Sequence, residues 1–503
     1  MLRQLSRFGS SVRHASSSRQ NNIIERASLL TEPDQVMFIE DHGNTSYGQF
    51  MKRAGQYTTA LSETYKVKKG DRVMARVSKT VDTTALYIAC LQLGAIYIPV
   101  NPVYTEPETD YFLQDSEPTI LITCNEEIDN LFKHRVTVVN EDRLSEFTKT
   151  LKAATDIEHV ENGTYASICY TSGTTGKPKG SINTHGSLSS NGVALAKAWG
   201  FTQADKNFHA LPFYHTHGMF ISLQSTLFSH SALVWREKFD IEDAMAHMHL
   251  ATVFMGVPTF FSRIAASPLF KPEAFKNIRL FVSGSAPLPI PIIEKWKATT
   301  GQTVIERLGM TEAQVITSNP LHGERRVGTV GLPLDGVKVR ISSGGEVEIQ
   351  SPALFAGYWK NPAKTKSEFT EDGWFKTGDV GSLNSDGYLT IGGRSKDMII
   401  TGGFNVYPKE LEDIIDSLPD VKESAVIAAP HPDFGEAVVA VVVAKNRVDN
   451  EAEFSSKIVN HMKKQVANYK VPKRIILLDA LPRNSITKIQ KNVLRDTYKH
   501  LFD

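Results

Sequence analysis

Short apolar runs alternate with helical stretches along most of the chain. ASICY (166–170), ATVFMGV (251–257) and IRLFVSGS (278–285) are predicted strands, and stretches such as IPIIEKWKATTG (290–301) between them are predicted helices. The strands are apolar almost throughout, which is typical of a parallel sheet covered on both faces. The alternation of strand and helix predicts an α/β fold.

The pattern changes after about residue 330. KVRI (338–341) and EVEIQ (346–350) are short alternating strands and predict a β-subdomain. A polar, glycine-bounded joint follows at 392–403, and beyond it lies a compact unit with both helices and strands. We therefore predict a large N-terminal domain over 21–396, with mostly parallel covered sheets plus the β-subdomain. A small, mobile α+β domain is predicted over 397–503.

Residues 1–20 differ from the rest of the chain in composition. They are rich in serine, and the first acidic residue is Glu25. An arginine-rich, acid-free segment with one apolar helical face is typical of a mitochondrial transit peptide. Its arginines are Arg3, Arg7, Arg13 and Arg19, and its apolar face holds Leu2, Leu5, Phe8 and Val12. The sequence predicts a cleaved leader over 1–20 and a protein of the mitochondrial matrix; the alternative is a disordered tail.

Charge and cysteine content narrow the class of protein. The chain has 56 Lys and Arg against 55 Asp and Glu, so its formal net charge is +1 and no nucleic-acid partner is indicated. No apolar run reaches about 18 residues, so no membrane insertion is predicted. The three cysteines, Cys90, Cys124 and Cys169, lie in apolar runs without a Cys-x-x-Cys pair. They are predicted to be buried free thiols in a reducing compartment.

The clearest chemical motif is YTSGTTGKPKG (170–180), which follows a predicted buried strand. Its glycines let the backbone curl so that N–H groups and hydroxyls surround phosphate oxygens, and Lys177 and Lys179 add positive charge. It is not a Walker A loop, because Pro178 stands where that motif requires Ser or Thr. The motif predicts a phosphate-binding loop of another kind; the alternative is a flexible surface loop.

Five motifs in order resemble the signatures of the adenylate-forming enzymes, a family that includes acyl-CoA synthetases, luciferases and peptide-synthetase adenylation domains. The resemblance spans roughly residues 25–495. The motifs are YTSGTTGKPKG (170–180), GMTE (309–312), WFKTGDVG (374–381), GGRSKDMIITGGFNVYPKELE (392–412) and LPRNSITKIQK (481–491). The resemblance implies that ATP and a carboxylate give an acyl-adenylate and diphosphate, after which a thiol such as coenzyme A displaces AMP. It also implies Mg²⁺ as cofactor.

The resemblance implies roles for individual residues. Glu312 and Thr174 hold Mg²⁺, and Thr311 contacts the α-phosphate. Lys488 bridges the attacking carboxylate and the α-phosphate, and His215 belongs to the same catalytic set. The residues implied to bind the nucleotide are Thr171, Ser172, Gly173, Thr174, Thr175, Gly176, Lys177, Lys179, Asp379 and Arg394. For any one of them alone, an ordinary surface turn or charged tail is the alternative.

Asp397 resembles the family's hinge residue, about which the small domain rotates between the two half-reactions. The chain departs from the family pattern at two positions. Thr487 stands before Lys488 where glycine is usual, so it must accept that backbone conformation or shift the loop. Leu308 stands before GMTE where a tyrosine usually stacks on adenine, and leucine lacks that π surface.

The segments around the expected acid pocket are similar to those of malonyl-CoA synthetases within this family. These segments are LPFYHTHGMF (211–220), GVPTFFSR (256–263), VSGSAPLP (282–289) and IERLGMTE (305–312). The resemblance implies that Arg263, Ser285 and Arg307 contact a distal carboxylate of the substrate. Thr216 and Met310 are then side-wall residues that limit branching of the acid. His215 and His217 are expected to supply hydrogen bonds rather than a zinc site, because no further ligand cluster accompanies them.

The position of Arg307 points to the same acid on physical grounds. It lies at the end of a predicted buried strand, and a lone buried guanidinium is costly unless an anion pairs with it. Glu306 is not expected to be that anion, because neighbours on a strand point to opposite faces. A free carboxylate on the substrate would complete a bidentate pair. The alternative is that Arg263 and Arg307 pair with acids elsewhere in the fold.

The sequence thus predicts an ATP- and Mg²⁺-dependent ligase that makes malonyl-CoA from malonate and coenzyme A. A synthetase for methylmalonate or another short- or medium-chain acid is the second hypothesis. A nucleotide-binding regulator without catalysis is the third, supported by Thr487 and Leu308 alone.

Overall fold

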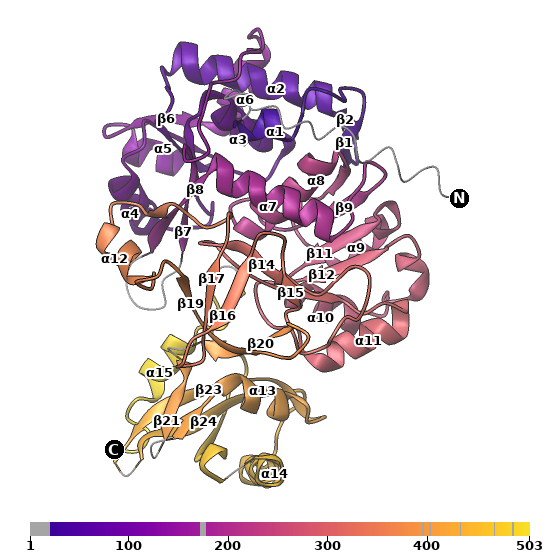
Figure 1. Cartoon of the computed structure of the whole chain (residues 1–503), viewed down its shortest axis with the longest axis vertical. Coiled ribbons are helices and arrows are strands. Elements are labelled where there is room, and N and C mark those ends of the chain that lie inside the picture. Colours follow the sequence, from indigo (N-terminus) through magenta and orange to yellow (C-terminus); the bar gives the residue numbers. More distant parts are fainter. Residues whose placement is uncertain are drawn as a thin grey trace.

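The computed structural model describes residues 21–171, 178–394, 397–401, 404–432, 434–466, 468–484 and 487–503 (Figure 1). The predicted leader lies outside the described residues, and so do six residues of the phosphate loop: Ser172, Gly173, Thr174, Thr175, Gly176 and Lys177. Their predicted roles therefore stay predictions. Within the described ranges, no helix is long and apolar enough to cross a membrane.

The first large sheet has nine strands, parallel from β13 to β1 and antiparallel at both edges. In spatial order they are β15 (Leu332–Pro333), β14 (Gln314–Ser318), β13 (Ile305–Met310), β12 (Leu280–Ser283), β11 (Val253–Gly256), β9 (Lys206–His209), β10 (Ala232–Trp235), β1 (Val36–Glu40) and β2 (Gly43–Ser46). The apolar runs predicted as strands at 251–257 and 278–285 form β11 and β12. Their parallel pairing explains why they are buried on both faces.

The second large sheet has seven strands and is parallel from β7 to β6. In spatial order they are β18 (Gly357–Tyr358), β8 (Lys179–Thr184), β7 (Tyr165–Thr171), β4 (Ile96–Pro99), β3 (Arg72–Arg76), β5 (Ile120–Thr123) and β6 (Thr137–Asn140). Strands β7 and β8 are antiparallel and flank the phosphate loop. The two parallel-rich sheets confirm the predicted α/β class.

Helices cover these sheets, as Figure 1 shows. They are α1 (Ile23–Arg26), α2 (Tyr47–Thr59), α3 (Val81–Leu93), α4 (Glu106–Ser116), α5 (Glu126–Phe132), α6 (Glu141–Lys149), α7 (His185–Ala198), α8 (Leu223–Ser229), α9 (Ile241–His247), α10 (Pro258–Ala266), α11 (Ile290–Thr300) and α12 (Pro362–Ser367). Two π-helical segments are η1 (Ala60–Thr64) and η2 (His217–Ser222), and two 3₁₀ segments are η3 (Met248–Leu250) and η4 (Pro272–Phe275).

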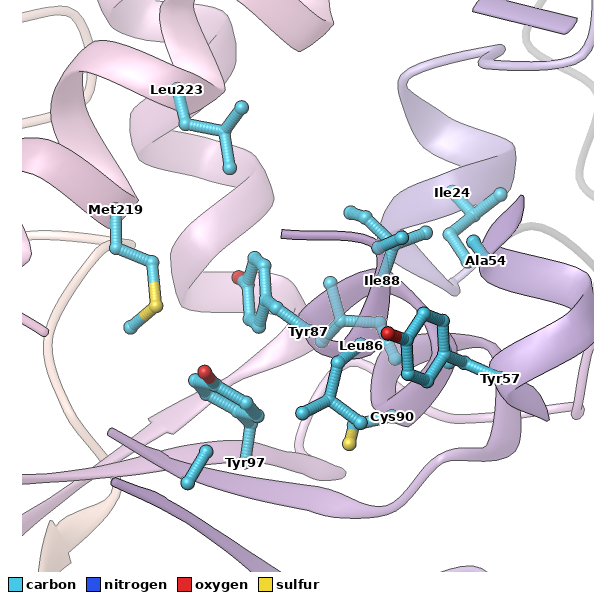
Figure 2. Close-up of a cluster of buried hydrophobic side chains, with 14 of the residues drawn as sticks. Ile24, Ala54, Tyr57, Leu86, Tyr87, Ile88, Cys90, Tyr97, Met219 and Leu223 are labelled. Atoms are coloured by element: carbon cyan, nitrogen blue, oxygen red, sulfur yellow. The ribbon is translucent and has the colours of Figure 1, made fainter. Parts of the chain in front are cut away.

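Helix α3 forms the centre of the largest core. Thr80 and Thr83 make a capping box at its start, and Gly94 with φ +66° ends it in the left-handed region that glycine tolerates. The core around the helix takes residues from strands of both large sheets. Figure 2 shows the ring of Tyr87 beside that of Tyr97, with centroids 5.1 Å apart. The two sheets are therefore joined through one apolar core, which fixes the position of one relative to the other.

The predicted β-subdomain is a four-stranded antiparallel sheet of β16 (Lys338–Ile341), β17 (Glu346–Gln350), β19 (Phe375–Leu383) and β20 (Leu389–Arg394). The last part of the chain has its own sheet of β22 (Phe404–Val406), β21 (Ile399–Thr401), β24 (Gly435–Ala444), β23 (Val421–His431) and β25 (Arg474–Leu477). Its helices are α13 (Pro408–Asp416), α14 (Glu451–Gln465) and α15 (Lys491–Tyr498), with the short η6 (Asn468–Lys470). The boundary at residue 396 stays a prediction.

The cysteines match the prediction in part. All three are free thiols, and Cys90 and Cys169 are buried. Burial raises the pKa of Cys169 to about 12, so its thiol is unreactive at neutral pH. The prediction was wrong for Cys124, which is only half-buried because it lies just beyond the end of β5 rather than within the sheet.

Candidate active site

Arg307 is a buried cation on β13. Only 6% of its surface is exposed. The guanidinium rests on two glycines, since a Cβ atom on Gly284 would lie 2.3 Å from its Cζ and one on Gly309 would lie 2.9 Å from its Nη1. Within the described ranges, its Nε and Nη2 have no hydrogen-bond partner. Burial lowers the pKa of Arg307 to about 10, so the group still carries its charge at neutral pH.

Glu306, the residue before it, does not neutralise this charge. Its carboxylate accepts a hydrogen bond from the Leu288 N–H at 3.2 Å. Burial raises the pKa of Glu306 to about 7. The two side chains belong to successive positions of one strand and so point to opposite faces. No ion pair joins Arg307 to any acid among the residues that the structure describes.

A serine and a histidine lie beside this cation. The Ser285 Oγ and the His217 Nδ1 are 3.2 Å apart, and Ser285 has the left-handed φ of +75°. His217 is buried, and within the described part of the chain its Nε2 has no partner. Burial, followed by the charge of Arg307, lowers the pKa of His217 well below its usual value. The imidazole is therefore neutral and can act as one donor and one acceptor.

The segment before His217 continues the same wall. The His217 N–H donates to the His215 Nδ1 at 3.3 Å. Burial, then the charges of Arg307 and Lys488, lowers the pKa of His215 to about 4. Thr216 is buried and directly precedes η2. The structure thus brings His215 and His217, with Thr216 between them, within reach of the Arg307 charge, and their role in an acid pocket stays a prediction.

Asp379 and Arg394 face each other across strands β19 and β20, where they are register partners. The Arg394 Nε lies 2.8 Å from the Asp379 Oδ1, and Asp379 is buried. The Arg394 Nη1 also donates to the Thr377 carbonyl at 3.3 Å, and the Thr377 hydroxyl accepts the Asp379 N–H at 3.1 Å. This hydrogen-bond network fixes a carboxylate and a guanidinium side by side. The carboxylate can accept from ribose hydroxyls, and the guanidinium can donate to phosphate oxygens.

Glu312 lies in the turn between β13 and β14, together with Thr311. Glu312 is buried, and its Oε1 accepts a hydrogen bond from the Tyr358 hydroxyl at 2.9 Å. Burial raises the pKa of Glu312. Thr311 is half-buried, and its carbonyl accepts from the Gln314 side chain at 3.4 Å. Strand β13 and the turn after it therefore carry Arg307 and, five residues later, a buried carboxyl group.

Leu308 and Met310 both pack against the apolar cluster that joins β14 to the β-subdomain. The cluster includes Ile316, Val347 and Phe355, which are buried. Leu308 therefore contributes apolar packing at the position where the family usually has tyrosine. The predicted role of Met310 as a wall for the acid stays a prediction.

Lys488 comes from the last part of the chain and reaches this site. Burial of its ammonium group, then the charge of Arg394, lowers the pKa of Lys488, while Asp379, Asp397 and Glu312 oppose the shift. The residue as a whole is exposed, so the burial concerns its ammonium group and not the rest of the side chain. Its amino group is close enough to interact electrostatically with the buried carboxyl groups of Asp379 and Glu312.

The other predicted residues lie at or just beyond the ends of strands and helices. Thr171 ends β7 and Lys179 begins β8, so both flank the phosphate loop, and the Lys179 Nζ lies 5.5 Å from the centre of the Tyr358 ring. Arg263 is exposed in the last turn of α10, and the structure shows no contact between it and Arg307. Asp397 follows β20 and accepts a 2.7 Å bond from Arg495.

Residues 26–359 match the family described as "AMP-binding enzyme", and residues 410–488 match the "AMP-binding enzyme C-terminal domain". The chain belongs to the AMP-binding enzyme family. This confirms the resemblance that the five motifs indicate.

Two curated relatives of this AMP-binding enzyme are similar over most of their length. The malonate–CoA ligase of Arabidopsis thaliana is 32% identical, over 93% of this chain and 87% of that protein. The mitochondrial malonate–CoA ligase of Xenopus laevis is 30% identical, over 94% of this chain and 91% of that protein.

A solved structure is similar throughout. The ATP-bound structure of MatB from Rhodopseudomonas palustris is 40% identical, with a TM-score of 0.92 over 96% of this chain and 100% of that one. The apo structure of the same protein gives a lower TM-score of 0.81 at the same coverage. The overall arrangement of this AMP-binding enzyme is therefore closer to that of the ATP-bound structure.

Sequence reasoning missed two residues of the site. Tyr358 binds Glu312 from β18, which is 46 positions further along the chain. Gly284 supplies the space that the Arg307 guanidinium occupies. The only sequence signal for Gly284 is its place in the turn after β12, and for Tyr358 there was none, since pairings between distant elements leave no local pattern.

Proposed function

We propose that this chain is an ATP-dependent ligase that joins malonate to coenzyme A. Malonate and ATP form malonyl-adenylate and diphosphate, and the CoA thiol then displaces AMP to give malonyl-CoA. Relatives named malonate–CoA ligase support the class of reaction. The buried charge of Arg307 supports the choice of acid.

The observation that carries the proposal concerns two donors of the buried Arg307 guanidinium, Nε and Nη2. Nε and Nη2 donate from one edge of the planar group. In Arg53 and Arg279 of the same chain, this edge holds an aspartate carboxylate at N···O distances of 2.7–2.8 Å. In Arg307 the same two donors have no partner among the described residues. A free carboxylate of the substrate fits them as a bidentate pair.

We assign two further predicted residues, Ser285 and Arg263, to the same carboxylate. Ser285 presents its hydroxyl next to His217, beside the Arg307 charge. Arg263 is exposed and forms no ion pair with a described acid, so its guanidinium is free to reach a substrate. Thr216 and Met310 act as side walls in this proposal and restrict substitution on the α-carbon of the acid.

The nucleotide end of the site serves the first half-reaction. Asp379 accepts hydrogen bonds from the ribose, and Arg394 donates to the sugar or a phosphate. Thr311 donates to the α-phosphate. Lys488 neutralises the attacking carboxylate and the α-phosphate as charge develops between them. Thr171, Lys179 and the loop between them surround the other phosphates.

The residues around Glu312 fit a magnesium ion. A buried carboxylate with one oxygen held by Tyr358 is a hard oxygen ligand of the kind that Mg²⁺ binds. Burial raises the pKa of Glu312, and a bound cation would favour the charged form instead. Glu312, together with Thr174, would hold the ion, which when bound neutralises phosphate charge.

We also propose that the small domain rotates about Asp397 between the two half-reactions. Lys488 must be near the α-phosphate in the first half-reaction and away from the CoA path in the second. The Asp397–Arg495 bond ties the hinge to α15 of that domain, so the hinge and the domain move together.

A panel of carboxylic acids tests the proposal by ATP-dependent release of diphosphate. We expect malonate to be turned over with a higher kcat/KM than acetate, butyrate or octanoate, because only malonate places a second carboxylate on Arg307. A preference for octanoate would overturn the choice of acid. Methylmalonate is the second candidate, and its ratio to malonate shows how closely the side walls fit. Absence of diphosphate release with every acid would favour a nucleotide-binding regulator.

Replacing Gly284 with alanine tests the acid site without changing a charge. The added Cβ would lie 2.3 Å from the Arg307 Cζ, so the guanidinium must move. Because a displacement of about 1 Å can cost about 10²-fold in rate, we expect a fall of that order in kcat/KM for malonate. Gly163→Ala is the matched control, since nothing lies within 4 Å of its Cβ position. Equal kinetics for both variants would contradict this role for Arg307.

For the leader we propose import into the mitochondrial matrix. The arginine-rich composition of residues 1–20 supports it, and so does the similarity to the mitochondrial ligase of Xenopus laevis. N-terminal sequencing of the protein recovered from mitochondria tests it, and an unprocessed Met1 would count against cleavage.

A further inference from the structure

Lys488 is carried by a tight turn between Arg483 and Ile489, which form an isolated antiparallel bridge. Asn484 holds Thr487 and Lys488 with three hydrogen bonds among the described residues. Its N–H donates to the Lys488 carbonyl at 3.0 Å, and its carbonyl accepts the Thr487 N–H at 2.9 Å. Its side-chain Oδ1 accepts the Lys488 N–H at 2.9 Å. The backbone of Lys488 is therefore fixed on both sides by one residue.

Arg483 fastens this turn to the sheet beneath it. Its Nη1 donates to the Thr487 carbonyl at 2.6 Å, and its Nη2 forms an ion pair with Glu423 on β23. The last carbonyl before Lys488 is thus tied, through Arg483, to a strand of the C-terminal sheet.

Thr487 makes the turn strained. Its φ of +63° lies in the left-handed region, where a β-branched side chain is disfavoured. The side chain is exposed, so burial of its methyl group does not offset that strain. The conformation persists only where surrounding bonds over-determine it. Those bonds come from Asn484 and Arg483.

We propose that Asn484 is a positioning residue for Lys488, which holds the strained Thr487 turn so that the lysine reaches the nucleotide site. The inference rests on the proposed function, in which Lys488 acts in adenylate formation. Without the Asn484 side chain, Thr487 is expected to relax toward negative φ. The Lys488 ammonium then moves away from Asp379 and Glu312, with which it interacts electrostatically in the intact turn.

The two half-reactions measured separately provide the test. Adenylate formation is followed by malonate-dependent exchange of labelled diphosphate into ATP, and thioester formation by CoA-dependent consumption of synthetic malonyl-adenylate. Asn484→Ala is expected to slow the exchange by about 10–10²-fold, the effect of a displacement near 1 Å. The KM for malonate and the thioester step should change less than about twofold, since the acid site is untouched. Asn484→Asp keeps the acceptor oxygen and should retain most of the exchange rate.

A second variant separates positioning from general loss of structure. If Asn484 acts by holding a strained turn, Thr487→Gly should restore several-fold of the exchange rate in the Asn484→Ala background, because glycine adopts positive φ without strain. Thr487→Val, which keeps the strain, should restore nothing. Asn450→Ala is the matched control, since Asn450 caps α14 in the same domain, away from the turn. It should leave the ratio of the two half-reactions unchanged.

The inference is overturned if Asn484→Ala slows both half-reactions equally, if Asn450→Ala gives the same asymmetry, or if the Val and Gly variants at 487 behave alike. The exchange assay on wild-type protein tests the choice of acid separately from the role of Asn484. If wild-type protein exchanges with methylmalonate and not with malonate, the malonate proposal fails, and the same variants are compared with methylmalonate.

Discussion

Replacing Arg307 with methionine is expected to lower kcat/KM for malonate by about 10³-fold, the upper part of the effect of removing one member of a buried, hydrogen-bonded charge pair. Turnover of acetate or butyrate should remain, because neither acid has a second carboxylate to place on Nε and Nη2. The measurement is diphosphate release over a range of each acid. Equal losses for malonate and acetate would mean that Arg307 supports the fold or the nucleotide rather than the acid.

The same substitution should leave the free protein as stable as wild type or make it more stable. Arg307 is a buried charge without an internal counter-ion among the described residues, and a methionine of similar length removes its desolvation cost. Malonate should raise the thermal midpoint of wild type and not that of the variant. Arg307→Lys keeps the charge but loses the two parallel N–H donors of the guanidinium, so it should bind malonate more weakly than wild type. A large drop in the thermal midpoint of Arg307→Met would instead reveal a structural role.

Replacing Lys488 with alanine is expected to slow adenylate formation by about 10²–10³-fold, the usual effect of removing one group that stabilises developing charge. Consumption of synthetic malonyl-adenylate by CoA should be nearly unchanged, because the proposed rotation moves the lysine away from the site in that half-reaction. Lys491→Ala is the matched control, since Lys491 is a neighbouring lysine that pairs with Glu412 within the small domain. A loss in the thioester step as large as that in adenylation would contradict the proposed division of roles.

The rate of adenylation should also depend on pH through Lys488. Burial and the charge of Arg394 lower the pKa of this amino group from its usual value. The charged form is the one that neutralises phosphate, so it is present below the lowered pKa and is lost as pH rises through it. We therefore expect adenylation to decline on the alkaline side at a lower pH than an ordinary lysine would give. This decline should be absent from the residual activity of Lys488→Ala.

Local pattern was enough to predict the elements of the fold. The apolar runs of β11 and β12 (Val253–Gly256 and Leu280–Ser283) appear as strands, and the predicted helix at 290–301 appears as α11 (Ile290–Thr300). These predictions succeed because a strand buried on both faces leaves an unbroken apolar run, and a helix with caps leaves its own signals. Cys124 shows the limit, because burial just past the end of a strand depends on what packs there.

At Thr487 the motif comparison identifies the unusual residue but not its backbone conformation. The sequence indicates that a residue other than glycine stands before Lys488, and so poses the question of its backbone conformation. The structure answers with φ +63° and shows which residues hold it there. The leucine at 308, where the family usually has tyrosine, packs into an apolar cluster with the β-subdomain.

The sequence by itself determined the family, the order of its motifs and the residue types that ATP and a carboxylic acid require. It also placed Arg307 and Glu312 on one short strand-and-turn segment, because their spacing is local. Only the tertiary structure decided that the Nε–Nη2 edge of Arg307 has no partner among the described residues, that Gly284 makes room for it, and that Tyr358 holds Glu312. The physical reason is that elements far apart in the chain set the burial and desolvation of a side chain. The chemical role of a charged group therefore depends on its neighbours in space.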